Sequence, residues 1–262
     1  MSDDVLLIER KDAVLWLTLN RPAAMNAVSP ALMGLLDSAV AQAETDATIR
    51  CVVITGAGKA FCAGADLKAV RSELGSEEGG IARFLKFAAS VMSRIEALPK
   101  PVIAAVNGLA LAGGLEIVLA CDLVLAAQSA KLGDAHINFG LLPGGGSSVR
   151  LPRKLGVNRA KYLLYSGDAL PAAEFVACGF VQQVVADDTL IAATEKLALK
   201  LASKSPLALR RIKQLVAGAL DQPQEMALAM ELLASEAHAH SHDLQEGLAA
   251  FAERRAPSFT GR

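Results

Sequence analysis

The stretch from Pro101 to Ala127, PVIAAVNGLALAGGLEIVLACDLVLAA, decides the fold class. Its patterning predicts four consecutive elements. They are a strand over Pro101–Val106, a turn over Asn107–Gly114, a short helix over Leu115–Ala120 and a second strand over Leu123–Ala127. A strand followed by a turn, a helix and another strand predicts α/β layering.

Three polar residues interrupt this stretch, which is the most apolar part of the chain: Asn107, Glu116 and Asp122. Because they break it up, no uninterrupted run of about 18 apolar residues exists, and a membrane span is not expected. Polar side chains inside an otherwise apolar stretch are instead candidates for a functional site.

Upstream of this stretch the sequence predicts further strands and helices. Val5–Arg10 and Ala13–Leu19 are β-rich and predict a hairpin, and Cys51–Thr55 predicts a short buried strand. Ser29-Pro30 predicts the N-cap and first residue of a helix with apolar residues at helical spacing. The polar segment Arg71–Gly80 predicts a mobile surface loop.

Downstream, the pattern changes from mixed to wholly helical. Pro171–Cys178 predicts a helix and Val181–Val185 a strand. Four helices are then expected, over Thr189–Ser203, Pro206–Ala219, Gln224–Ser241 and Asp243–Arg255. This shift predicts a core over residues 1–195 and a helical region over 196–262.

Composition and charge exclude several function classes. The chain has 262 residues, of which 53% are hydrophobic and 20% charged, so intrinsic disorder is excluded. With 26 basic and 27 acidic residues, the net charge of −1 gives no broad cationic surface for nucleic acid. Four widely spaced cysteines form no C-x-x-C pair, and there is no H-E-x-x-H motif, so no metal site is predicted. The N-terminus has no signal-peptide pattern, and a reduced, cytoplasmic setting is expected.

The segment Ala112–Glu116 combines two glycines with a glutamate at the start of a predicted helix. Backbone N–H groups at a helix N-terminus can stabilise negative charge on a ligand oxygen, and glycine lets that oxygen approach closely. Glu116 lies among apolar residues, which would raise its pKa and suit it to acid–base chemistry. The other interpretation is a solvated first-turn glutamate that only complements the helix dipole.

A second glycine-containing loop, Ala63–Lys68, follows the Cys51–Thr55 strand. It offers another backbone N–H beside a glycine. Two such donors from separate strand ends could converge on one oxygen, as an oxyanion hole requires.

The chain resembles the crotonase superfamily, also called the enoyl-CoA hydratase/isomerase family, along nearly its whole length. The segments that carry the resemblance are Asn20-Arg21-Pro22, Met25-Asn26-Ala27, Ile54-Thr55-Gly56, Lys59-Ala60-Phe61, Ala63–Leu67, Lys100–Val102, Ala105–Gly108, Gly113–Glu116, Ala120–Asp122, Gly140–Gly144 and Phe251–Pro257.

This resemblance implies a spiral of ββα units with a C-terminal helical domain that assembles trimers or hexamers. It implies acyl-CoA thioester substrates, with CoA part of the substrate and no separate cofactor. The N–H groups of Ala65 and Gly113 would form the oxyanion hole, and Glu116 would be a catalytic residue. The implied substrate-binding residues are Ala63, Ala65, Asp66, Leu67, Lys68 and Gly113. The leading activity is hydration of a 2-enoyl-CoA to a 3-hydroxyacyl-CoA. The alternatives are double-bond isomerisation by Glu116 alone or another crotonase-type reaction of an acyl-CoA.

The chain departs from the family at one position. Where hydratases of the standard type place a second glutamate, the sequence Leu132–Ile137 has His136. A histidine near its ordinary pKa can donate or accept a proton, so His136 is a candidate donor to the α-carbon. It could instead be a hydrogen-bonded substitute in an enzyme that uses Glu116 alone. Asp134 is a weaker candidate for the same pocket.

Overall fold

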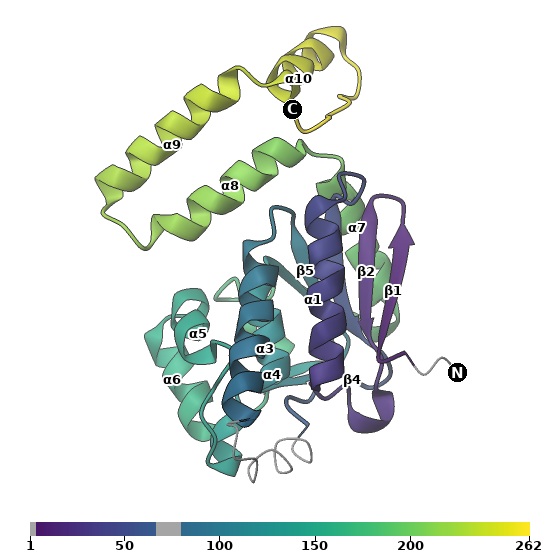
Figure 1. The fold of residues 1–262 in the computed structure, drawn as a ribbon, viewed down its shortest axis with the longest axis vertical. Coiled ribbons are helices and arrows are strands. Elements are labelled where there is room, and N and C mark those ends of the chain that lie inside the picture. The colour runs from purple at the N-terminus through teal and green to yellow at the C-terminus, as the bar shows by residue number, and fades with distance from the viewer. Residues whose placement is uncertain (1–3, 67–79) are drawn as a thin grey trace.

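The computed structural model of the chain describes residues 4–66 and 80–262. A six-stranded sheet forms its centre (Figure 1), in the order β1-β2-β3-β5-β7-β10. These strands span Leu6–Lys11 (β1), Val14–Leu19 (β2), Cys51–Gly56 (β3), Val102–Val106 (β5), Leu123–Ala127 (β7) and Gln183–Val185 (β10). Only β1 is antiparallel to its neighbour; the other pairs are parallel.

A smaller sheet of four short strands lies beside it, in the order β4-β6-β8-β9. The strands are Ala60–Cys62 (β4), Leu109–Leu111 (β6), Lys131–Gly133 (β8) and Leu170–Pro171 (β9). The chain passes from the larger sheet to the smaller one three times, from β3 to β4, from β5 to β6 and from β7 to β8. A helix follows β4 and β6, so the expected ββα arrangement is confirmed.

Helices pack against both sheets (Figure 1). They are α1 (Pro30–Thr45), α3 (Gly80–Ala97), α4 (Gly113–Ala120), α5 (Ser147–Leu155), α6 (Val157–Ser166) and α7 (Leu190–Ala202). The expected cap of α1 is present, because Ser29 Oγ accepts a hydrogen bond from the Leu32 N–H. All residues of α4 are buried, and this helix packs against α3, α5, β4 and β6.

The structure differs from the sequence-based prediction in two segments. The predicted turn Asn107–Gly114 contains β6, which pairs with both β4 and β8, and α4 starts at Gly113 instead of Leu115. The predicted helix Pro171–Cys178 is the end of β9 followed by a single turn of 3-10 helix, Ala172–Phe175, because the Ala172 N–H donates to the Ala130 carbonyl. The predicted loop Arg71–Gly80 lies outside the described residues except for Gly80, the first residue of α3.

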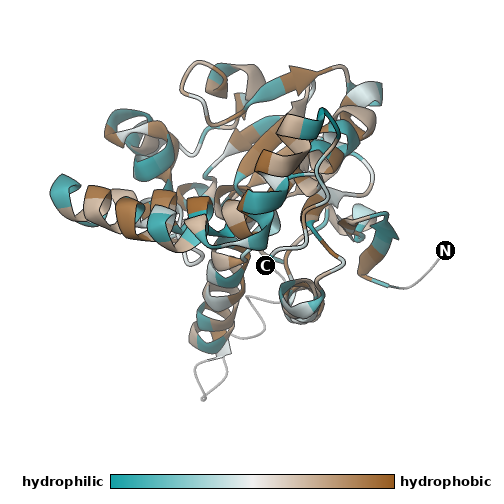
Figure 2. Ribbon diagram, turned by 90° about the horizontal axis from the view of Figure 1, so that it is seen from above, coloured by the Kyte–Doolittle hydropathy of each residue, from teal (hydrophilic) through white to brown (hydrophobic). Residues whose placement is uncertain are grey.

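Three C-terminal helices extend from the core: α8 (Pro206–Ala219), α9 (Gln224–Ala239) and α10 (His242–Glu253) (Figure 1). The expected division at residues 195 and 196 falls inside α7, which packs against β2, β3, β5 and β7. The helices that stand away from the sheet therefore begin at α8. Apolar residues occur along them, interspersed with polar ones (Figure 2). Within the described residues, no helix has the length and apolar character needed to cross a membrane.

Candidate active site

Glu116 is buried in the first turns of α4, with 3% of its surface exposed. Its Oε1 accepts hydrogen bonds from the Gly145 N–H (2.7 Å) and the Ser147 N–H (3.1 Å). Burial raises the pKa of Glu116 above its ordinary value, although the nearby His136 and the two N–H groups oppose this shift. The interpretation as a solvated first-turn glutamate is therefore excluded.

His136 lies between two carboxylates at the start of the 3-10 turn η2 (His136–Phe139). Its Nδ1 is 2.9 Å from Oδ1 of Asp134, and its Nε2 is 3.9 Å from Oε2 of Glu116. Burial alone would lower the pKa of His136, but the hydrogen bond and charge of Asp134, together with the charge of Glu116, raise it above its ordinary value. An Nδ1–H held by Asp134 leaves Nε2 directed at Glu116.

The backbone N–H groups of Ala65 and Gly113 lie close to each other, and Gly113 shares the first turn of α4 with Glu116. Val28 forms a parallel bridge to Ala65, donating to the Gly64 carbonyl and accepting from the Asp66 N–H, so the Ala65 N–H points away from Val28. Gly113 begins α4, where the first N–H groups have no intrahelical acceptor. Neither N–H has a hydrogen-bond acceptor among residues 4–66 and 80–262. A Cβ atom on Gly113 would lie 3.7 Å from the Ala65 nitrogen, so both donors border the same small space.

Ala112 directs the first amide of α4 through a backbone conformation that alanine rarely adopts. Its φ of 47° and ψ of −118° lie in a region that favours glycine. Such strain persists only where the surrounding structure holds it, and it concentrates at functional sites. Here the Ala112 N–H donates to the Gly133 carbonyl, which ties this residue to β8.

At positions 114 and 145, neighbouring atoms approach the backbone so closely that only glycine fits. A Cβ on Gly114 would lie 2.0 Å from the Cys62 carbonyl oxygen, so only glycine lets α4 pack this closely on β4. A Cβ on Gly145 would lie 2.6 Å from Oε2 of Glu116 and 2.3 Å from the Met92 sulfur. Glycine at 145 therefore leaves room for the buried carboxylate.

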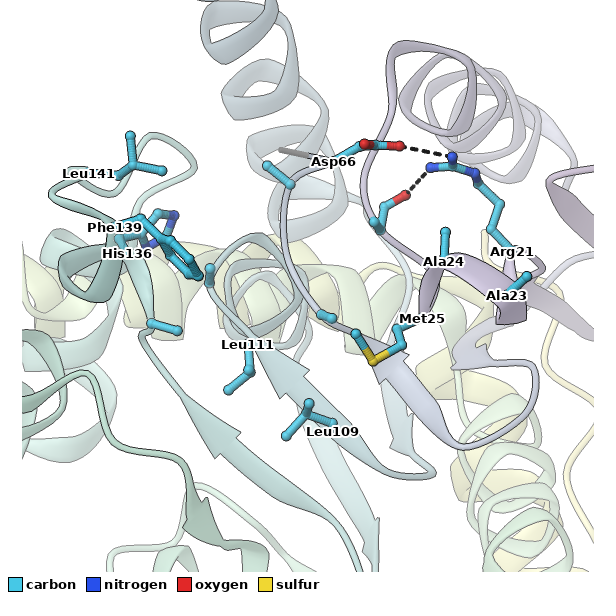
Figure 3. A pocket seen from close by; sticks show the side chains of 15 residues that line it. Arg21, Ala23, Ala24, Met25, Asp66, Leu109, Leu111, His136, Phe139 and Leu141 are labelled. Atoms are coloured by element: carbon cyan, nitrogen blue, oxygen red, sulfur yellow. Dashed lines mark hydrogen bonds and ion pairs between the residues drawn. The ribbon is translucent and has the colours of Figure 1, made fainter. Parts of the chain in front are cut away.

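A cavity of about 580 Å³ opens beside these groups (Figure 3). Ala63, Ala65, Asp66 and His136 line it, while Glu116 lies behind His136. Gly113 is next to the lining residue Ala112. The predicted substrate-binding residues Leu67 and Lys68 lie outside the described residues.

An ion pair stands at one side of this cavity (Figure 3), with Arg21 Nη2 2.9 Å from Oδ2 of Asp66. Arg21 also donates to the Ala27 carbonyl at 2.7 Å, so it joins the segment before α1 to the loop that carries the Ala65 amide. In the sequence, Arg21 belongs to the Asn20-Arg21-Pro22 motif, and nothing local indicates its ion pair with Asp66. The spacing to Asp66 offered no signal, because the two residues are far apart in the chain.

Two further contacts of the site cannot be predicted from the sequence. The glycine cluster Pro143–Gly146 is evident in the sequence, but the hydrogen bonds from Gly145 and Ser147 to Glu116 are not, and Asp134 contributes more than expected. Asp134 is 1% exposed and fixes His136, and its Oδ2 has no partner among the described residues. Within that part of the chain, no group of three histidine, cysteine or acidic side chains is arranged to hold a metal ion.

The family model for enoyl-CoA hydratase/isomerase matches residues 9–262. The chain belongs to this family, the crotonase superfamily. It is 37% identical to the putative enoyl-CoA hydratase/isomerase YngF of Bacillus subtilis, over 100% of both chains. It is 39% identical to the 2,3-dehydroadipyl-CoA hydratase of Escherichia coli, over 98% of this chain and 99% of that protein.

Solved structures agree with this assignment. The crystal structure of an enoyl-CoA hydratase from Bacillus anthracis superposes with a TM-score of 0.93 at 39% identity, covering 98% of this chain and 100% of that one. The crotonase fold, with two mixed sheets and C-terminal helices, is thereby confirmed, and the protein is an enzyme of this family.

Proposed function

We propose that this enzyme adds water to the double bond of a 2-enoyl-CoA and forms a 3-hydroxyacyl-CoA. One observation carries the proposal: the Glu116 carboxylate and Nε2 of His136 face each other at 3.9 Å, beside the two amides that border one small space. The relatives named as hydratases support the substrate class, and among them is a crotonyl-CoA hydratase from Syntrophomonas wolfei that is 35% identical over 100% of both chains.

In this proposal the thioester carbonyl oxygen accepts hydrogen bonds from the Ala65 and Gly113 N–H groups. Attack at the β-carbon moves negative charge onto that oxygen as an enolate forms. Donors fixed in advance at that oxygen stabilise the charge without reorganising, and each is worth about 3 kcal/mol of the barrier. Ala63 and Asp66, which line the cavity, would border the path of the CoA moiety.

Glu116 and His136 would divide the proton transfers. Ionised Glu116 removes a proton from water as the water oxygen bonds to the β-carbon, and the His136 imidazolium gives its Nε2 proton to the α-carbon. The product has then gained one water, Glu116 is protonated and His136 is neutral. Since 3.9 Å exceeds a hydrogen bond, a water between the two groups would return the proton and reset the site.

Isomerisation of the double bond is the alternative activity. It is favoured by the absence of a second glutamate at position 136, because Glu116 alone would then carry one proton between two carbons of the acyl chain. Hydration removes the conjugated enoyl-thioester absorbance and adds the mass of water. Isomerisation moves the double bond and leaves the mass unchanged.

The test is a panel of short, medium and branched 2-enoyl-CoAs, beginning with crotonyl-CoA, and of matching 3-enoyl-CoAs. Absorbance and product mass are recorded for the wild-type enzyme and for Glu116→Gln. Hydration predicts products of higher mass from the 2-enoyl series only. Turnover that survives unchanged in Glu116→Gln would refute the assigned site.

We also infer that the enzyme forms a homotrimer or homohexamer through residues 196–262, in the cytoplasm. None of the residues of α9 is buried in the single chain, although it carries Leu232 (61% exposed) and Leu233 (58%). Large apolar side chains that are exposed together on one helix are typical of a protein–protein interface. Four free cysteines, three of them buried, support a reducing compartment.

A further inference from the structure

Arg150 contacts the glycine loop Gly144–Gly146, which also contacts Glu116. It extends from α5, and only 11% of its side chain is exposed. Its Nη1 donates to the Gly145 carbonyl at 2.5 Å. The same residue, Gly145, uses its N–H to hold Oε1 of Glu116. One residue of the loop is thus bonded to the Arg150 guanidinium and to the Glu116 carboxylate.

Helix α3 in turn fixes the guanidinium. Nε of Arg150 donates to Oε2 of Glu96 at 2.9 Å, and Nη2 lies 2.7 Å from the same oxygen. Nη2 also donates to the Ser93 hydroxyl at 3.3 Å. Arginine suits this place, because its planar fork can hold a carboxylate and a carbonyl at the same time, which a lysine ammonium cannot do with the same geometry.

We propose that Arg150 is a positioning residue for the reaction, which fixes the Gly144–Gly146 loop and through it the Glu116 carboxylate. The inference rests on the proposed function, in which Glu116 is the base. The Glu96 carboxylate and the Ser93 hydroxyl hold Arg150 in place. The path therefore runs from α3 through Arg150 and Gly145 to the reacting group on α4.

Arg150 is separated from the substrate. It lines a second cavity of about 270 Å³, bordered by Ser93, Glu96 and Gly144–Gly146, and no residue that lines this cavity also lines the 580 Å³ cavity of the active site. A change at Arg150 should therefore alter the rate of the chemical step and leave substrate affinity unchanged. Displacements of about 1 Å at a reacting group cost roughly 100-fold in rate.

The experiment compares Arg150→Met with Arg153→Met, using crotonyl-CoA as the probe. Arg153 is on the same helix and borders the same cavity. Its half-exposed guanidinium, however, forms an ion pair with Asp221 and does not hold the glycine loop. We expect kcat of Arg150→Met to fall by about 10- to 100-fold with KM unchanged. Arg153→Met should keep wild-type kcat. Arg150→Lys should recover part of the rate, and free guanidinium at non-denaturing concentration should restore part of the rate of Arg150→Ala.

Two further measurements separate positioning from general stability. In Arg150→Met the acid limb of the pH–rate profile should move to higher pH, because a loosened loop gives the Glu116 carboxylate weaker hydrogen bonds. In the Glu116→Gln background, Arg150→Met should have little further effect, since both changes act on one group.

The outcomes are distinct. Wild-type kcat in Arg150→Met, an unmoved acid limb, or a full additional loss in the Glu116→Gln background would each overturn the role of Arg150. If Glu116→Gln itself keeps wild-type turnover, the proposed function fails. If Glu116→Gln is inactive while Arg150→Met is fully active, only the inference about Arg150 fails.

Discussion

Nε2 of His136 lies 3.9 Å from Oε2 of Glu116, with the opposite ring nitrogen bound to Asp134. The carboxylate and the imidazole therefore face each other across a gap that a water molecule can bridge. Burial raises the pKa of Glu116, and Asp134 raises that of His136 against the effect of its own burial. Addition of water requires a base and an acid at the same pH, here an ionised Glu116 and a protonated His136.

The wild-type pH–rate profile should be bell-shaped. Glu116 must be ionised to accept a proton from water, so the rate should rise as pH increases through its raised pKa. His136 must be protonated to donate, so the rate should fall as pH increases through its own raised pKa. The profile of kcat/KM for crotonyl-CoA measures both limbs. A profile in which the rate shows no decrease on its basic side would speak against titration of His136 in catalysis.

Replacing His136 by glutamine should remove the basic limb and lower kcat by about 100-fold or more, the usual contribution of a general acid. The acid limb should also move to higher pH, because the charge of His136 lowers the pKa of Glu116 in the wild-type enzyme. The control is thermal unfolding of the variant at neutral pH. If the pH–rate profile of His136→Gln is the same bell-shaped curve as that of the wild type, this histidine transfers no proton in the reaction.

Asp134→Asn should lower the pKa of His136, since the Asp134 hydrogen bond and charge are what raise it. The basic limb should consequently move to lower pH, and kcat at neutral pH should fall less than in His136→Gln. NMR titration of the imidazole measures the pKa directly. If this pKa is the same in both proteins, Asp134 does not act through His136.

Two adjacent glycines should respond in opposite ways to alanine. In Gly113→Ala the new methyl group meets only ordinary contacts of 3.5 Å or more, yet it lies 3.7 Å from the Ala65 nitrogen, where the thioester oxygen would bind. We expect a stable protein whose kcat/KM falls by about 100-fold, the loss typical of a missing oxyanion donor. Gly114→Ala places a methyl group 2.0 Å from the Cys62 carbonyl oxygen and should lower the free energy of unfolding by about 1–3 kcal/mol or more.

Thermal unfolding and kinetics on both glycine variants check this contrast. An active Gly113→Ala enzyme would remove the Gly113 amide from the proposed oxyanion hole. A Gly114→Ala protein with wild-type stability would mean that α4 can shift away from β4 without cost.

Assembly should depend on the apolar surface of α9. Leu232→Lys places a charge where 61% of the leucine is exposed in the single chain, and it should reduce the molar mass measured by light scattering at a fixed protein concentration. Ile8→Lys is the matched control, because Ile8 is 48% exposed on β1, far from these helices in the chain. Equal masses for wild type and Leu232→Lys would exclude this face as an interface.

Much of the larger sheet could be predicted, because four of its strands are five or six residues of buried apolar sequence with clear boundaries, as in Cys51–Gly56 and Leu123–Ala127. The smaller sheet could not. Leu109–Leu111 and Lys131–Gly133 are only three residues long, and their pairing depends on strands distant in the chain. The ββα units also differ in length, so the sequence has no fixed period that would reveal them.

The proposed catalytic side chains could be selected from the sequence, because Glu116 is a charge in an apolar helix and His136 occupies a motif position of the family. Their supporting contacts could not. The bonds from Gly145 and Ser147 to Glu116, and from Arg150 to Glu96, join residues 29, 31 and 54 positions apart in the chain. Hydrogen bonds of this kind follow from the tertiary fold and leave no local pattern.

The most direct test of the account is the mass of the product formed from crotonyl-CoA by the wild-type enzyme and by Glu116→Gln. We expect the wild-type product to gain the mass of one water as the enoyl absorbance disappears. Glu116→Gln, although folded, should form this product at a rate lower by about 100-fold or more. A product of unchanged mass, or equal rates for the two proteins, would contradict hydration by Glu116.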